Sequence, residues 1–197
     1  MKILCTGNPD KNTIAKCIRD LYPETEFVYL SNGYNFLTTD GLDKFRQKVK
    51  DFDVFINASR IDIGVQIELL KIVRSEWETG SVINIGTTME FHYFHHLDKE
   101  CAIDKLRLRD LGLDMSTEYF RVTHLIVGGF TDETPQANSK MDKKHIGNTV
   151  KYVLDNRDNF HVPIISLEND FWNKGQVGSG CNYQELKNRG RNYDLYR

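Results

Sequence analysis

The stretch KILCTGNPDKN, residues 2–12, predicts a buried β-strand that leads through a turn directly into a helix. Its first residues are mostly apolar, which is typical of a strand covered on both faces. Gly7 and the polar residues after it are turn formers. Residues 11–22 then carry apolar side chains at helical spacing, with Asp10 or Asn12 as the N-cap. A strand, a turn and a helix in this order form the repeating unit of parallel α/β sheets.

The same unit recurs along the chain. Short runs of β-branched and aromatic residues predict further strands over residues 26–31, 53–59, 81–86, 121–130 and 162–167. Helical periods precede three of these strands, on Leu42, Phe45 and Val49, on Ile63, Ile67, Leu70 and Trp77, and on Ile146, Val150, Val153 and Leu154. This alternation predicts an α/β fold, a single-domain Rossmann-like, doubly wound parallel sheet with helices on both faces. We expect the domain to span residues 1–170, and the glycine-rich residues 171–197 to form an irregular tail that packs on the domain or on a neighbouring subunit.

Composition limits the classes of function. The 197 residues carry a formal net charge of −2, which gives no basic field for nucleic acid or for an anionic membrane. No apolar run is long enough to span a membrane, and the N-terminus lacks a signal-peptide core. The four cysteines have no CxxC spacing, which suits a reducing compartment. These features predict a cytoplasmic protein.

Small and polar residues follow five of the predicted strands, as CTGNPDKN, LSNGYN, INASRID, INIGTTMEF and VGGFTDETP. In an open α/β sheet the ligand crevice lies beyond the carboxyl ends of the strands. Ordinary strand-to-helix turns also favour such residues. Five polar ends in one chain nevertheless favour a nucleotide-type crevice over ordinary turns.

Four of these segments resemble the short-chain dehydrogenase/reductases, in order and in spacing. KILCTGNP is similar to the first strand of that family and its TGxxxGxG turn, and DVFINAS to the fourth strand with its Asn-Ala-Gly. VINIGTT resembles the fifth strand, which normally ends in a catalytic serine, and RVTHLIVGGFTDETP the sixth strand and its continuation. The resemblance implies a Rossmann sheet that binds NAD(H) or NADP(H) and uses a Ser-Tyr-Lys set to reduce carbonyls or oxidise alcohols. It also implies a homodimer or homotetramer, whose interface would use the segments around Val65–Trp77 and Cys101–Leu111.

The resemblance implies a dinucleotide site, with departures from the family pattern. Gly7 is the only glycine of the first turn that the chain keeps. The predicted second strand ends at Ser31 without an acidic residue for a ribose 2′-hydroxyl, which favours NADP(H) over NAD(H). The implied cofactor-binding residues are Thr6, Gly7, Asn8, Ser31, Asn57, Ala58, Ser59, Gly128, Gly129 and Thr131.

The catalytic residues of the family are only partly matched. Thr87 stands where the family has its serine, and a threonine hydroxyl can still donate to a carbonyl oxygen. If Lys99 is the lysine of Tyr-x-x-x-Lys, His95 occupies the position of the tyrosine. A shift of one residue instead places His96 there and Glu100 at the lysine, while Tyr93 lies six residues before Lys99.

Three interpretations of the histidines compete. His92, His95 and His96 have metal-like spacing, but no carboxylate ligand accompanies them, so we predict no metal site. A histidine near Thr87 could serve as proton donor at neutral pH. The third interpretation is that the aromatic-histidine run packs against the sheet or a neighbour and that the reductase chemistry is altered or lost. Two functions therefore stay open, an oxidoreductase that uses Thr87, His95 and Lys99 with weak activity, and a non-catalytic nucleotide-binding or regulatory protein.

Overall fold

The computed structural model describes residues 1–59, 61–88, 90, 99–128, 130–131 and 141–167. One six-stranded parallel sheet forms its centre, in the order β2-β1-β3-β4-β5-β8. The strands are β1 (Ile3–Thr6), β2 (Glu26–Val28), β3 (Val54–Asn57), β4 (Gly80–Thr87), β5 (Phe120–Val127) and β8 (Ile164–Leu167). The predicted Rossmann-like α/β class is confirmed.

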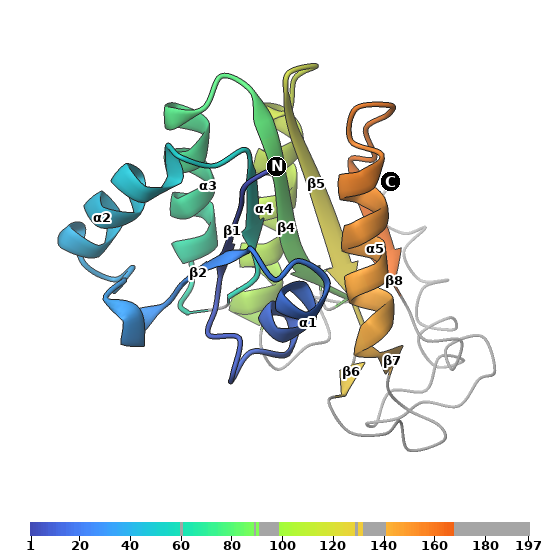
Figure 1. The fold of residues 1–197 in the computed structure, drawn as a ribbon, viewed down its shortest axis with the longest axis horizontal. Coiled ribbons are helices and arrows are strands. Elements are labelled where there is room, and N and C mark those ends of the chain that lie inside the picture. The colour runs from blue at the N-terminus through green and yellow to red at the C-terminus, as the bar shows by residue number, and fades with distance from the viewer. Residues whose placement is uncertain (60, 89, 91–98, 129, 132–140, 168–197) are drawn as a thin grey trace, which may run out of the picture.

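Helices cover both faces of the sheet (Figure 1). One face packs against α2 (Thr39–Val49), α3 (Val65–Glu76) and α4 (Lys99–Met115), and the other against α1 (Thr13–Leu21) and α5 (Lys143–Asp155). The alternation of side chains along the strands explains this arrangement. Leu4, Phe55 and Val82 belong to the core of the first face, while their neighbours Cys5, Ile56 and Ile83 belong to the core of the second.

The second strand is shorter than the sequence predicted. Residues 26–31 were expected to be extended, but β2 ends at Val28 and a short 3-10 helix, η1 (Leu30–Asn32), follows. The side chain of Asn32 explains the difference, because it accepts the Tyr29 backbone N–H at 2.8 Å and donates to the Phe27 carbonyl at 2.6 Å. This local competition for the backbone ends the strand. Ser31 therefore lies exposed in η1 and not at the end of a strand.

Two further predictions about elements were wrong. The strand expected over residues 121–130 ends at Val127, and the pair β6 (Phe130–Thr131) and β7 (Met141–Asp142) forms a separate small sheet. Ile63 does not face the core in a helix, because it precedes α3 and is 50% exposed. The predicted cap of α1 is resolved in favour of Asn12, whose side chain accepts the Ala15 N–H at 3.0 Å.

The order of the strands sets the position of a crevice. In the dinucleotide-binding order 3-2-1-4-5-6, a third strand lies outside the second. Here α2 leads from β2 straight to β3, so that β2 is the edge of the sheet. The strand β1 has β2 on one side and β3 on the other, so the strand order reverses between β1 and β3. The carboxyl ends of these two strands therefore form the topological switch point, which is the place where open α/β sheets bind ligands.

Candidate functional site

Thr6 joins the ends of β1 and β3. Its hydroxyl oxygen accepts the backbone N–H groups of Ala58 at 2.8 Å and of Ser59 at 3.0 Å, and its side chain is fully buried. The structure thus brings together three residues that the sequence predicted for cofactor binding. The Thr6 side chain serves the architecture of this corner, since its oxygen is engaged by the two amides.

Gly7 occupies a position at which any side chain would be strained and crowded. Its φ of +118° lies in the region that favours glycine. A Cβ atom there would lie 2.7 Å from Ser59 Oγ and 3.2 Å from Asn12 Cγ. The Gly7 N–H donates to the Val28 carbonyl at 3.0 Å and so ties the turn to the end of β2. The turn thus lies close to the end of β2, to Ser59 after β3 and to the N-cap of α1. A glycine turn of this kind lets a ligand contact the backbone.

The turn that follows is rich in side-chain contacts to backbone. The Asn8 side chain accepts the Asp10 N–H at 2.9 Å, and the Asn8 carbonyl accepts the N–H groups of Lys11 and Asn12. Asp10 pairs with Arg19 at 2.8 Å, which offsets the negative charge of the carboxylate beside the N-terminus of α1. The positive end of a helix dipole favours anions at this position.

Asn57 is held inside the fold. Its side-chain nitrogen donates to the Gln66 carbonyl at 2.8 Å and to Asn84 Oδ1 at 3.1 Å. The side-chain nitrogen of Gln66 in turn donates a hydrogen bond to the Asn57 carbonyl at 2.6 Å. The pair fixes the first turn of α3 against the end of β3, and the role of Asn57 in cofactor binding stays a prediction.

Lys105 is a buried lysine that the sequence interpretation missed. It lies in α4, is 7% exposed, and donates to the side-chain oxygen of Gln66 and to the Ile85 carbonyl at 2.8 Å. Ile85 lies one residue beyond the last paired residues of β3 and β4, and two residues before Thr87. The lysine therefore lies at the end of β4, where the sequence predicted catalysis.

A spacing in the sequence could have indicated Lys105. Cys101 and Lys105 are four residues apart on α4, which is the separation of tyrosine and lysine in Tyr-x-x-x-Lys. Residues four apart on a helix share a face, and both are buried. Lys99, the lysine predicted from the sequence, lies exposed in the first turn of α4. Its catalytic role stays a prediction.

The remaining predicted residues are distributed as follows. Thr87 is half-buried at the end of β4, and the Gly128 N–H donates to the Leu167 carbonyl at 2.9 Å beyond β5. Thr131 lies in β6. His95 and Gly129 lie outside the described residues, as do His92, Tyr93 and His96. Within the part of the chain that the structure describes, no group of histidine, cysteine, aspartate and glutamate side chains could hold a metal ion.

Burial controls the chemistry of the cysteine on β1. Desolvation raises the pKa of the fully buried Cys5 thiol far above its ordinary value, so the thiol stays neutral and is no nucleophile. Within the described ranges, no helix is both long and apolar enough to cross a membrane.

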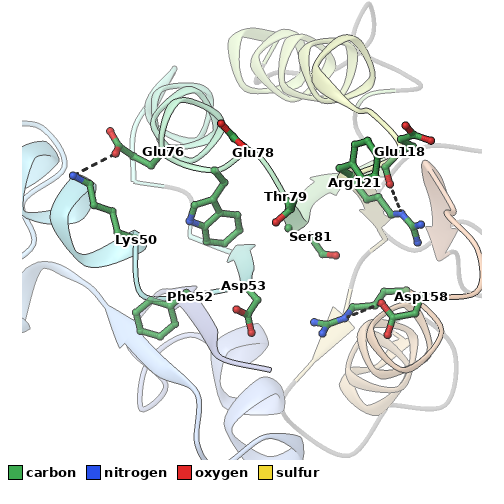
Figure 2. Close-up of a pocket in the computed structure, with 14 residues that line it drawn as sticks. Lys50, Phe52, Asp53, Glu76, Glu78, Thr79, Ser81, Glu118, Arg121 and Asp158 are labelled. Carbon is green, nitrogen blue, oxygen red and sulfur yellow. Dashed lines mark hydrogen bonds and ion pairs between the residues drawn. The ribbon is translucent and has the colours of Figure 1, made fainter.

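A hollow of about 560 Å³ opens at the opposite end of the sheet (Figure 2). Its lining includes Asp53, Ser81 and Arg121, which lie at the amino ends of β3, β4 and β5. Charged side chains in it pair with one another, Lys50 with Glu76 at 3.4 Å and Arg157 with Asp158 at 3.8 Å. Ligands of parallel α/β sheets bind at the carboxyl ends. We therefore place the candidate site at the Gly7 turn and the end of β4.

Comparison with known proteins agrees with this geometry at the level of the fold. A scan with family models and a search of curated proteins both find no match. Among solved structures, a short-chain dehydrogenase/reductase of the glucose/ribitol dehydrogenase type from Brucella melitensis superposes with a TM-score of 0.64 at 11% identity, covering 84% of this chain and 94% of that one.

Two further solved structures contain nucleotides. A short-chain dehydrogenase from Burkholderia cenocepacia in complex with NADP matches with a TM-score of 0.64 and 12% identity over 96% of this chain and 98% of that chain. The 3-alpha-hydroxysteroid dehydrogenase from Pseudomonas, complexed with NADH, matches with a TM-score of 0.62 and 10% identity over 90% of this chain and all (100%) of that chain. The fold is thus that of the short-chain dehydrogenase/reductases, as the four sequence segments predicted.

Proposed function

We propose that the chain binds a nicotinamide dinucleotide across the ends of β1 and β3 and acts as a divergent oxidoreductase on a carbonyl or alcohol substrate, with weak activity. The observation that carries the proposal is the Gly7 turn. Gly7 has a positive φ, and a Cβ atom there would contact Ser59. The chain therefore presents its backbone, without a side chain, at the N-terminus of α1. Such a turn fits a diphosphate.

Different residues of the crevice would contact different parts of the cofactor. Gly7 and Asn8 would meet the diphosphate, and Ala58 and Ser59 the adenosine ribose beside it. Exposed Ser31 supports the preference for NADP(H), because no carboxylate accompanies it in η1 to repel a 2′-phosphate. Gly128, Gly129 and Thr131 would lie near the nicotinamide. When bound, the nicotinamide supplies or accepts the hydride.

The chain itself must supply a proton to the oxygen of a reduced carbonyl. Thr87 would donate a hydrogen bond to that oxygen, and His95 or His96 would supply the proton. We propose Lys105 as the lysine of the site, with Lys99 as the alternative that the sequence alone suggests. Lys105 is buried beside the end of β4 and bonded to Gln66 and Ile85, so its amino group has a fixed position.

One observation favours the non-catalytic alternative. When Lys105 is taken as the lysine, a buried cysteine, Cys101, stands four residues before it in place of a tyrosine. A thiol at that position lacks the reach of a phenol. A protein that kept the crevice and lost the acid would bind nucleotide without turnover.

Turnover tests the two functions against each other. We expect slow NADPH-dependent reduction of carbonyl substrates that rises toward acid, because an imidazole donates a proton only when protonated. His95→Ala or His96→Ala should lower the rate by about 10²–10⁴-fold, while His145→Ala, exposed on α5, should leave it unchanged. Fast turnover that survives the double replacement of His95 and His96 would identify Tyr93 as the acid and contradict this assignment.

The ion pair at the turn gives a smaller prediction. Arg19→Ala leaves Asp10 uncompensated beside the proposed diphosphate, and the pair is exposed, with side chains 37% and 75% accessible. Exposed pairs contribute about 0.2–1 kcal/mol, so NADPH affinity should fall by roughly 1.4- to fivefold at low salt. Adding Asp10→Asn should restore it, as measured by fluorescence titration. Failure of the double variant to recover affinity would place the phosphates elsewhere.

We also propose that the protein self-associates. The resemblance implies pairing through α3 and α4, whose outer surfaces carry charged side chains such as the Glu68–Lys71 pair and Arg107. Light scattering at micromolar concentration should detect a dimer or tetramer, and a single monomeric species would contradict this expectation.

A further inference from the structure

A buried carboxylate lies just beyond the end of β4. Glu90 is 2% exposed, and its Oε1 accepts the backbone N–H of Thr87 at 2.8 Å. Both carboxylate oxygens lie close to Nε2 of His124, at 3.0 and 3.2 Å. Arg109 Nη1 on α4 approaches Oε2 at 3.8 Å. Burial of a carboxylate is unfavourable unless it is paired and hydrogen-bonded, and Glu90 has both kinds of partner.

Gly86 makes room for this carboxylate. A Cβ atom at Gly86 would overlap with Nε2 of His124 and with Oε1 of Glu90. The strand therefore lacks a side chain where the two groups meet, one residue before Thr87. The absence of a Cβ atom at Gly86 in β4 therefore provides the space that Glu90 and His124 occupy.

His124 depends on Glu90 for its hydrogen bonding. The imidazole lies on β5 at 1% exposure, beside Asn84 in the register of β4 and β5. Among the described residues, its Nδ1 has no hydrogen-bond partner. Buried polar groups need hydrogen-bond partners, so the Glu90 carboxylate is what holds the His124 ring in place. The imidazole thus anchors the Glu90 carboxylate to the centre of the sheet.

We propose that Glu90 is a positioning residue for Thr87. Its carboxylate ties the Thr87 N–H to β5 through His124 and to α4 through Arg109. This contact fixes where β4 ends. The inference rests on the proposed function, because Thr87 matters only if a substrate oxygen binds there. Removal of the carboxylate should loosen Thr87 and leave the Gly7 turn on β1 and α1 unchanged.

The test compares Glu90→Ala with Glu90→Gln in the full chain. Hydrogen exchange of the Thr87 amide, NADPH affinity and turnover are measured on each variant. A hydrogen bond to a charged acceptor protects its amide by about 10- to 100-fold, so Glu90→Ala should accelerate exchange at Thr87 by this factor. Turnover should fall by a similar factor with NADPH affinity unchanged. Glu90→Gln keeps the acceptor oxygen and should retain most of the protection.

A matched control and a second pair of variants complete the test. Glu76→Ala removes a carboxylate that pairs with Arg46 and Lys50 far from Thr87, and should leave Thr87 exchange unchanged. If Glu90→Ala does not fold, His124→Gln, which can still donate to Glu90, should keep Thr87 protected, whereas His124→Leu should not.

The outcomes separate the two claims. Unchanged exchange at Thr87 in Glu90→Ala, or unchanged exchange in His124→Leu if the first variant is unfolded, would overturn the positioning role. So would acceleration spread over all strands, which would identify a purely structural pair. The absence of NADPH binding by the wild-type protein would instead refute the proposed function, whatever the exchange at Thr87.

Discussion

Gly7→Val should eliminate the stabilisation of the protein by NADPH and NADH. A β-branched residue at φ +118° is strained by about 1–3 kcal/mol, and its side chain would collide with Ser59 Oγ. Relief of that collision requires Ser59 or the turn to shift, and the added side chain would occupy the N-terminus of α1, where the diphosphate is proposed to bind. Thermal unfolding with and without dinucleotide measures the loss.

Gly33→Val is the matched control for this change when NADH is the ligand, because Gly33 caps the short helix that carries Ser31 and NADH lacks the 2′-phosphate proposed to bind there. Gly33 has a φ of +96°, but a Cβ there would meet nothing within 4 Å. The control therefore carries similar backbone strain without filling the turn. We expect both variants to be less stable than the wild type, and only Gly7→Val to lose the shift caused by dinucleotide. Equal shifts in the two variants would show that the site lies elsewhere.

Lys105→Met should have the second large effect, on turnover. The replacement keeps the length and the burial of the side chain but removes the ammonium group and leaves Gln66 Oε1 and the Ile85 carbonyl without this donor. Loss of the bonds should destabilise the fold by about 1–3 kcal/mol. If Lys105 supports the proton donor, the rate of carbonyl reduction should fall by about 10²–10⁴-fold.

Lys99→Met separates the two candidate lysines. Lys99 is exposed in the first turn of α4, so its replacement should change stability by less than about 0.5 kcal/mol. Rates measured side by side assign the role. A large loss in Lys99→Met with little loss in folded Lys105→Met would restore the assignment made from sequence.

The sequence predicted the elements whose side chains follow a simple period. The strands β1, β3, β4 and β8 follow from apolar runs and turn formers, whereas the sequence left Asp10 and Asn12 open as the cap of α1 and the structure selects Asn12. The prediction failed at β2, because the carboxamide of Asn32 competes with the sheet for the backbone there. Such a contact depends on local geometry that composition does not encode.

The site was harder to predict, since its buried residues are polar. Lys105 and Asp104 are both buried on α4, which obscures the apolar period that would mark the inner face. Glu90 and His124 pair across 34 positions of the chain, and only the missing side chain of Gly86 allows them to meet. The available signals were a histidine within an apolar strand and the spacing of Cys101 and Lys105.

Titration of the full chain with NADPH and NADH, followed by thermal unfolding and calorimetry, tests the proposed crevice most directly. Binding to the folded state alone should give a saturable shift, and ligand at about 100 times Kd should add about 2.7 kcal/mol. For a chain of this size that corresponds to roughly 5–11 °C in Tm. We predict this shift, with NADPH the tighter ligand. The absence of any shift or heat with either dinucleotide at millimolar concentration would contradict the account.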